Sequence, residues 1–237
     1  LPTAKKVKRV RIMSKKEKKV KQKPTKLEKV FKKLHFWEKH FYRVFCPYVR
    51  HGNLSKYEDT PLICIGNHYS YMDVVFPCLV TDRPIHFIAK QELYDNGGFM
   101  KWFVKKCECI LVKRDGSDVQ AIKESMRILK AGGVINIFPE GTRNHSYAEI
   151  LPFHSGAAAL SIKTQTPIVP IVKVTKIKLF KKTHVIYGDP IEFRQYYGKK
   201  VTKEQIEECD NILREAMTNM RLAFLDKHPI KFKSDKV

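Results

Sequence analysis

The sequence has no apolar run long enough to cross a lipid bilayer as a helix. Its longest apolar windows, such as residues 74–80, fall far short of the ~20 residues that a spanning helix needs. No secretory signal peptide is visible either. Any contact with a membrane is therefore expected to be interfacial, as in a peripheral or monotopic protein.

Paired cysteine motifs are also missing. The six cysteines lie at positions 46, 64, 78, 107, 109 and 209, and none of them forms the two C-x-x-C pairs of a zinc ribbon. The spacing does not suggest a disulfide scaffold, so a reducing cytosolic setting is the simplest interpretation. We expect no bound metal.

Acidic residues are scarce, with 24 Asp and Glu against 46 Lys and Arg, which gives a formal net charge of +22. A surplus of this size favours polyanionic partners, namely nucleic acid, an anionic bilayer or a phosphorylated substrate. The 43% of apolar residues in 237 positions is enough to bury one substantial core and excludes a fully disordered chain. Charge alone does not choose among the three partners.

The basic residues are concentrated near the N-terminus, where Lys and Arg dominate residues 5–33. The sequence therefore predicts two parts: a basic, amphipathic helical membrane-association segment over residues 1–55 and a folded domain over residues 56–237. Within the first part, apolar residues recur at steps of three and four over residues 27–48, which is helical periodicity. Pro47 interrupts this pattern.

The apolar face of this helix is rich in aromatic residues and its polar face is rich in lysine. Such a helix suits the headgroup region of an anionic bilayer. The candidate membrane-binding residues are Lys26, Lys29, Phe31, Lys33, Trp37 and Phe41. The alternative is that the same apolar face packs on the core of the domain.

Beyond residue 60, short apolar runs alternate with helical stretches. Strands are predicted at 62–65, 85–89, 109–112, 134–138, 168–174, 184–187 and 190–193. Helices are predicted at 73–80, 98–105, 117–131, 155–163 and 203–225. This alternation predicts an α/β fold with a mostly parallel central sheet flanked by helices.

A histidine and an aspartate follow the first predicted strand, as His68 and Asp73. Residues five apart in one helix lie about 140° apart around its axis, so the pair can meet only where a strand turns into a helix. Ser70 would cap that helix. An imidazole can take a proton from an alcohol, and a carboxylate can orient it. The alternative is that Asp73 completes a capping box and His68 is an ordinary loop residue.

A second motif, Phe-Pro-Glu-Gly-Thr-Arg, follows a predicted strand at residues 138–143. The turn presents Glu140 and Arg143 together. An arginine binds phosphate oxygens through its planar fork, and Gly141 lets backbone amides approach a ligand closely. The alternative is a surface turn with a salt bridge.

Four blocks in this order resemble the glycerolipid acyltransferase family, and within it the 1-acyl-sn-glycerol-3-phosphate acyltransferases. The blocks are N-H-x-S-x-x-D at 67–73, the arginine-bearing strand end at 110–114, F-P-E-G-T-R at 138–143 and V-P-I-V at 169–172. The resemblance covers roughly residues 60–175, about half of the chain.

The resemblance implies transfer of an acyl group from acyl-CoA or acyl-carrier protein to the 2-hydroxyl of 1-acylglycerol 3-phosphate, which gives phosphatidic acid. His68 would be the general base and Asp73 its partner. The glycerol phosphate would be bound by Lys90, Arg114, Glu140, Gly141, Thr142 and Arg143. No cofactor is implied beyond the thioester, and the implied location is the cytoplasmic face of the cell membrane.

Several alternatives stay open. Within the class, the alternatives are acylation of glycerol 3-phosphate or of another lysophospholipid. Thr142 favours lysophosphatidate as the acceptor, because the related glycerol 3-phosphate enzymes more often resemble F-P-E-G-S-R. Outside the class, the charge also fits a basic nucleic-acid- or lipid-binding protein. A nucleic-acid partner leaves the ordered blocks unexplained, and no zinc-finger or RNA-binding signature is present, so none is expected.

Overall fold

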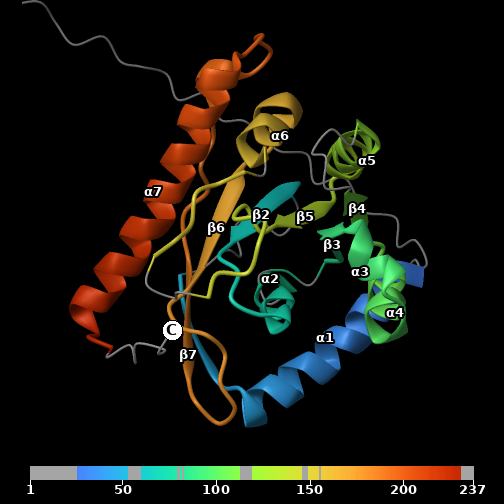
Figure 1. The fold of residues 1–237 in the computed structure, drawn as a ribbon, viewed down its shortest axis with the longest axis vertical. Coiled ribbons are helices and arrows are strands. Elements are labelled where there is room, and N and C mark those ends of the chain that lie inside the picture. Colours follow the sequence, from blue (N-terminus) through green and yellow to red (C-terminus); the bar gives the residue numbers. More distant parts are fainter. Residues whose placement is uncertain are drawn as a thin grey trace, which may run out of the picture.

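A central sheet with helices on both faces forms the body of the protein (Figure 1). The computed structural model of the chain describes residues 26–52, 60–78, 81, 83–112, 119–145, 149–154 and 156–230. The strands are β1 (Tyr48–His51), β2 (Leu62–Gly66), β3 (Ile85–Lys90), β4 (Ile110–Val112), β5 (Val134–Ile137), β6 (Ile168–Lys173) and β7 (Thr183–Tyr187).

The sheet has the strand order β1-β7-β6-β2-β5-β3-β4. Neighbouring strands run parallel, except that β6 and β7 are antiparallel. Every residue of β2, β5 and β6 is buried, which explains why these strands are continuous apolar runs in the sequence. The predicted α/β class and mostly parallel sheet are confirmed.

The structure contains one strand that was not predicted and lacks one that was. Residues 48–51 form β1 and pair with β7, so the sheet begins inside the segment predicted to end at residue 55. Three of its residues are only partly buried and Arg50 is exposed, which left no apolar run to recognise. Residues 190–193 form only an isolated bridge between Ile191 and Ile168, since the preceding Pro190 has no N–H to extend a ladder.

The helices surround the sheet. They are α1 (Lys26–Phe45), α2 (Val75–Cys78), α3 (Gln91–Asp95), α4 (Gly98–Lys106), α5 (Val119–Lys130), α6 (Ala157–Thr164) and α7 (Lys203–Lys227), with 3-10 helices at Tyr71–Val74 and Arg194–Tyr196. Helices α1, α4, α5, α6 and α7 have bounds close to those predicted, whereas α3 was not predicted. The helix predicted at 73–80 is instead a 3-10 turn followed by the short α2. Among the residues that the structure describes, no helix is both long enough and apolar enough to cross a membrane.

Alternate residues of the central strands enter two separate cores. Ile63 and Ile65 of β2 pack with α5, α6 and α7 on one face, whereas Leu62 and Cys64 pack with α1 and α2 on the other. This division follows from the period of two along a strand. Helix α1 is therefore part of the folded domain as well as of the predicted membrane segment.

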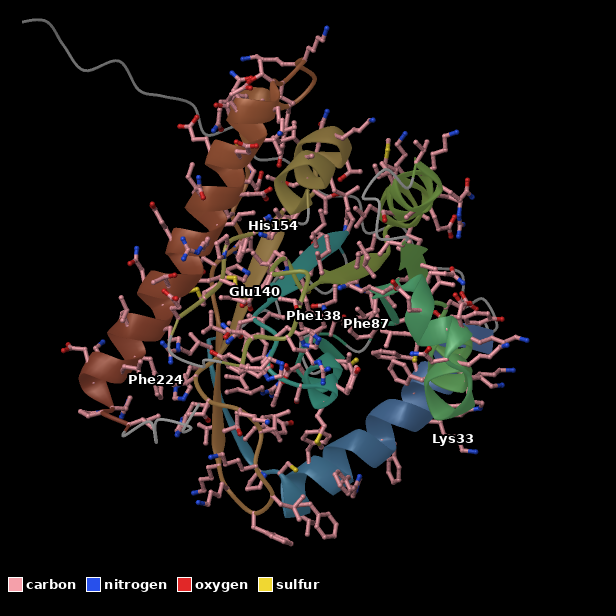
Figure 2. The ribbon with its side chains drawn as sticks, viewed as in Figure 1. Lys33, Phe87, Phe138, Glu140, His154 and Phe224 are labelled. Atoms are coloured by element: carbon pink, nitrogen blue, oxygen red, sulfur yellow. The ribbon has the colours of Figure 1, made fainter. Side chains whose placement is uncertain are left out.

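The packing of α1 corrects one of the predicted membrane contacts. Phe31 is buried in the core beside the sheet, so its side chain faces the domain and not a bilayer. Lys29 and Lys33 are exposed, with Lys33 at the periphery of the molecule (Figure 2), and Phe41 is also exposed. The side chains of Lys26 and Trp37 lie outside the described residues.

Candidate active site

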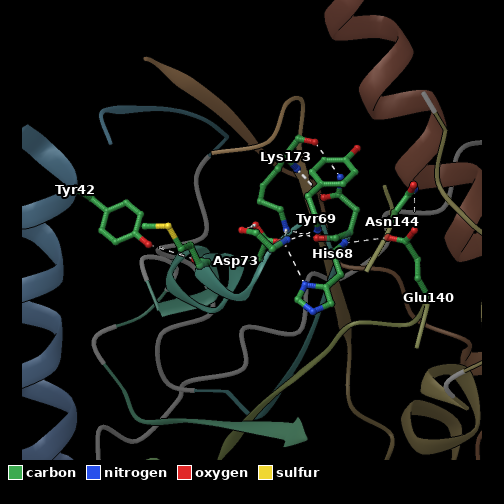
Figure 3. A network of polar contacts seen from close by, with 10 residues as sticks. Tyr42, His68, Tyr69, Asp73, Glu140, Asn144 and Lys173 are labelled. Carbon is green, nitrogen blue, oxygen red and sulfur yellow. Dashed lines mark hydrogen bonds and ion pairs between the residues drawn. The ribbon is translucent and has the colours of Figure 1, made fainter. Parts of the chain in front are cut away.

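The predicted histidine and aspartate meet where β2 turns into the 3-10 helix. Nδ1 of His68 lies 3.1 Å from Oδ2 of Asp73, and the contact is drawn in Figure 3. The Asp73 side chain is completely buried, whereas 16% of the His68 side chain is exposed. The geometric prediction from their spacing is confirmed.

The chain between the two residues holds the carboxylate in place. The backbone N–H groups of Tyr69 and Ser70 donate to Oδ2 of Asp73 at 2.5 and 2.7 Å, and the Ser70 hydroxyl donates to Oδ1 at 3.3 Å. The predicted capping box at Ser70 is therefore present in part: Asp73 accepts from the Ser70 N–H, but the Ser70 hydroxyl donates to Asp73 and accepts no backbone N–H from the described residues. The aspartate is fixed before any ligand binds.

A buried lysine that the sequence interpretation missed completes this network. Nζ of Lys173, at the end of β6, lies 3.5 Å from Oδ2 of Asp73, and its side chain is only 2% exposed. It also donates to the backbone carbonyl of Asn67. The ammonium lies 5.8 Å from the ring centroid of Tyr69 and 5.4 Å from that of Phe138, where cation–π attraction partly replaces its lost hydration.

Asn67 connects the ends of β2 and β6 through its side-chain amide. Its Nδ2 donates to the carbonyl of Lys173 at 2.9 Å, and the backbone N–H of Lys173 donates to its Oδ1 at 2.8 Å. The amide thus copies a pair of backbone groups and extends the pairing of the strands past Gly66. This bridge fixes Lys173 beside the loop that carries His68.

The charges in the network oppose the effect of burial. Burial raises the pKa of Asp73, but the ammonium of Lys173, the hydrogen bond with His68 and the two backbone amides outweigh it, so the pKa lies below its ordinary value. Burial lowers the pKa of Lys173, against the attraction of Asp73 and Glu140. An ionised Asp73 accepts the Nδ1–H of His68, which leaves Nε2 as the nitrogen that can accept a proton.

Residues of the second motif and the loop after it hydrogen-bond the backbone at His68. Oε1 of Glu140 accepts from the His68 N–H at 2.9 Å, and Oε2 accepts from the Leu151 N–H and the Asn144 amide, both at 3.1 Å. Asn144 in turn donates its backbone N–H to the His68 carbonyl at 2.7 Å. Because Glu140 is buried and both of its oxygens are bound internally, it holds the site together, which corrects its predicted place among the ligand-facing residues.

The ring of His68 is fixed by stacking as well as by hydrogen bonding. It lies on the ring of Phe138, with a centroid separation of 4.3 Å and an interplanar angle of 15°. Stacking sets the plane of the imidazole, and the contact with Asp73 sets its rotation within that plane. Figure 2 shows Phe138 and Glu140 together in the middle of the molecule, at the sheet.

The described members of the predicted phosphate-binding set lie in the turn after β5 and at the end of β3. Gly141 and Thr142 are exposed, and the guanidinium of Arg143 lies 4.3 Å from the ring centroid of Tyr71 in the 3-10 helix. Lys90 is exposed at the end of β3. Arg114 lies outside the described residues.

The described residues among these, together with His68, follow parallel strands at one edge of the sheet. Strands β2, β3 and β5 run parallel, so the segments that follow them lie at the same carboxyl edge, where open α/β sheets bind their ligands. Among the described residues, no group of three or more His, Cys, Asp or Glu side chains could hold a metal ion. The fold and the site together define an α/β protein with a hydrogen-bonded histidine–aspartate pair at the carboxyl edge of its sheet.

Comparison with known proteins gives the family. Residues 48–174 match the family model described as Acyltransferase, and because the match covers more than half of the chain, the chain belongs to the acyltransferase family. It is similar to the 1-acyl-sn-glycerol-3-phosphate acyltransferase of Bacillus subtilis, with 30% identity over 142 residues that cover 56% of this chain and 68% of the relative.

Two further relatives extend the comparison. The human 1-acyl-sn-glycerol-3-phosphate acyltransferase alpha is 36% identical over 115 residues, which cover 47% of this chain and 40% of the human protein. The fold resembles the crystal structure of the 1-acyl-sn-glycerophosphate (LPA) acyltransferase PlsC from Thermotoga maritima, with a TM-score of 0.58, 21% identity and coverage of 87% of this chain and 80% of that one.

Proposed function

We propose that the chain transfers a fatty acyl group from an acyl-CoA or acyl-carrier-protein thioester to the 2-hydroxyl of 1-acylglycerol 3-phosphate, and so forms phosphatidic acid. The observation that carries the proposal is the 3.1 Å contact between His68 and Asp73 at the carboxyl edge of the sheet. Membership of the acyltransferase family and the names of the similar bacterial and human proteins support the choice of reaction and acceptor.

The proposed cycle needs one proton shuttle. Nε2 of His68 takes the proton of the acceptor hydroxyl as its oxygen attacks the thioester carbonyl carbon, while Asp73 stabilises the imidazolium. The tetrahedral intermediate collapses, the carbon–sulfur bond breaks, and His68 returns the proton to the leaving thiolate. The substrate hydroxyl is the nucleophile, so the cycle includes no acyl-enzyme and uses no cofactor beyond the thioester.

Lys173 acts in this proposal as a positioning residue. Its ammonium stabilises the ionised form of Asp73 through Oδ2, the same oxygen that contacts His68. A carboxylate that stays ionised holds the imidazole in the tautomer that leaves Nε2 free of a proton. Lys173 thus assists proton transfer without touching the substrate.

The phosphate of the acceptor is assigned to the basic groups at the same edge. The guanidinium of Arg143 lies over the ring of Tyr71, and its N–H groups can form paired hydrogen bonds with phosphate oxygens. The turn at Gly141 and Thr142 and the ammonium of Lys90 would add donors. Arg114 remains a sequence prediction for the same role.

The proposal extends to the setting of the reaction. A two-chain product belongs in a bilayer, and the net charge of +22 favours an anionic surface, so we assign the protein to the cytoplasmic face of the cell membrane as a peripheral or monotopic enzyme.

The acceptor is tested by supplying an acyl-CoA or acyl-carrier-protein thioester with either lysophosphatidate or glycerol 3-phosphate, and by measuring thiol release together with the lipid product. We expect release with lysophosphatidate and phosphatidic acid as the product. Arg143→Gln should raise the KM for lysophosphatidate, whereas Lys101→Gln, at an exposed lysine of α4, should not. Release that depends on glycerol 3-phosphate alone would overturn the assignment of the acceptor.

A further inference from the structure

The connection between β6 and β7 ends in a tight turn of two exposed apolar residues. Lys178 and Lys181 form an isolated antiparallel bridge, which leaves Leu179 and Phe180 at the turn with 58% and 67% of their surfaces exposed. Phe180 has a φ of +57°, a conformation that glycine and asparagine usually occupy in such turns. Phenylalanine is therefore unfavourable in the backbone conformation of this turn, and neither it nor Leu179 is buried there.

The turn is fixed to the domain and does not project as a loose loop. Ile177, just before the turn, is buried in the core beside α1. The backbone N–H of Phe180 donates to the carbonyl of Phe45 at 2.6 Å, which joins the turn to the last residue of α1. Figure 1 shows this end of α1 next to the connection from β6 to β7.

Exposed apolar side chains of α1 continue the surface of the turn. The rings of Phe180 and Phe45 have centroids 5.8 Å apart, and those of Phe45 and Phe41 are 4.9 Å apart and stacked. Phe41, Val44 and Phe45 are 44%, 62% and 39% exposed. We call Phe41, Val44, Phe45, Leu179 and Phe180 the aromatic tip. A contiguous apolar surface of this kind marks an interaction site.

The charge around the aromatic tip indicates its partner. Lys178, Lys181 and Lys182 flank the turn and are exposed, and the sequence contains no Asp or Glu between Glu149 and Asp189. Apolar side chains at the centre with ammonium groups beside them match the two layers of an anionic membrane, where acyl chains lie beneath phosphate groups.

We propose that the aromatic tip docks on an anionic phospholipid bilayer and inserts Leu179 and Phe180 at the boundary between headgroups and acyl chains. The proposal rests on the proposed function and adds a contact, at Leu179 and Phe180, that lies outside the predicted N-terminal membrane segment. The strand that leads to the tip, β6, carries Lys173 at its end, and the parallel β2 leads to His68. The tip and the active site therefore share the carboxyl edge, and docking turns that edge toward the lipid substrate.

Helix α1 also connects the tip to the active site directly. The hydroxyl of Tyr42, one residue after Phe41, donates to the carbonyl of Met72 at 3.3 Å, within the 3-10 helix that contains Asp73 (Figure 3). The ring of Tyr42 also contacts Phe76 of α2 edge-on, with centroids 6.2 Å apart. The docking helix and the acid–base pair are thus parts of one packed unit.

The test compares binding of the full chain to vesicles of phosphatidylcholine with and without phosphatidylglycerol, by co-sedimentation. Leu179→Ser/Phe180→Ser should weaken binding to the anionic vesicles by about tenfold or more, because two apolar side chains no longer insert. The matched control, Ile212→Ser/Leu222→Ser, removes two similarly exposed side chains from α7 and should leave binding unchanged.

A second measurement keeps the proposal testable if the double serine variant does not fold. Phe180→Trp keeps an apolar ring at the turn, and its fluorescence emission should shift to shorter wavelength when anionic vesicles are added. Leu222→Trp on α7 should show no such shift. An unchanged emission at position 180 with wild-type binding by the double serine variant would overturn the proposal.

Two outcomes separate this proposal from the others. In detergent micelles the double serine variant should retain wild-type turnover of lysophosphatidate. If the wild type is inactive but its binding to vesicles still depends on the aromatic tip, the proposed reaction is wrong and the proposed docking surface is supported. If the serine substitutions instead convert a dimer to a monomer and leave vesicle binding unchanged, the tip is an interface between copies of the chain and the proposal is wrong.

Discussion

At the scale of single residues, the site depends on one buried ion pair behind the histidine. Asp73 and Lys173 are both almost completely buried, with 3.5 Å between Oδ2 and Nζ. A pair of this kind adds little net stability, but loss of one partner leaves an uncompensated charge in the interior. The pair therefore makes the ionisation of Asp73 sensitive to a residue that does not touch His68.

Lys173→Met tests this role through the pH dependence of the rate. Without the ammonium, the pKa of Asp73 should rise, because burial then acts with less opposition. The carboxylate would be ionised only at higher pH, so the acid limb of the kcat profile should move to higher pH. We expect kcat to fall about tenfold or more, equivalent to about 1.4 kcal/mol, and stability to fall by about 3–5 kcal/mol.

The double variant Asp73→Asn/Lys173→Met separates charge from packing. It removes both buried charges, so it should recover much of the stability that Lys173→Met loses while it remains poorly active. Lys163→Met, at an exposed lysine of α6, is the matched control and should change neither property. An unshifted acid limb in Lys173→Met would show that Lys173 serves only the packing.

The residues missed or misplaced by sequence reasoning share a physical cause. Lys173 receives its role from Asn67 and Asp73, which are about a hundred residues away in the sequence and meet it only through the pairing of β2 and β6. Glu140 looked like a ligand-facing group, but its acceptors are used by donors from other loops. By contrast, His68 and Asp73 were predictable because their contact is local.

At the scale of elements, the buried strands were the most predictable part. Continuous apolar runs identify β2, β5 and β6 because these strands are covered on both faces. The short β1 was missed because its strand character comes from pairing with β7. Periodicity predicted α1, but could not show that its buried face includes Phe31.

The turn after β5 provides a prediction at this scale. Gly141 has a φ of +62°, and a Cβ added there would have no heavy atom within 4 Å among the described residues. The cost of Gly141→Ala is therefore conformational, about 1–2 kcal/mol by thermal or denaturant unfolding. Because the turn also presents Thr142 and Arg143, the KM for lysophosphatidate should rise as well.

Gly198→Ala is the matched control for this turn. Gly198 has a similar φ of +71° and equally open surroundings, so it should lose a similar amount of stability but keep the wild-type KM. Gly141→Asn should be milder than alanine, since asparagine tolerates this conformation better. Equal effects of the two alanine substitutions on KM would contradict a role for the 138–143 turn in binding the acceptor.

At the scale of the whole molecule, the sheet brings the groups of three proposed functions to one edge. The carboxyl ends of the parallel strands carry the acid–base pair and the basic groups assigned to phosphate, and the same edge carries the aromatic tip. Helix α1 connects them, because it packs on the sheet, contacts the 3-10 helix and ends at the tip. The proposed enzyme thus takes up its acceptor from the surface on which it docks.

The most direct test of this account is thiol release from a thioester donor with lysophosphatidate and anionic vesicles, measured for wild type and His68→Ala. His228→Ala, at an exposed histidine after α7, is the control. The account predicts that His68→Ala stays folded and bound to vesicles but loses about 10²–10⁴-fold in kcat, with the control unaffected. A folded His68→Ala protein that releases thiol at nearly the wild-type rate would contradict it.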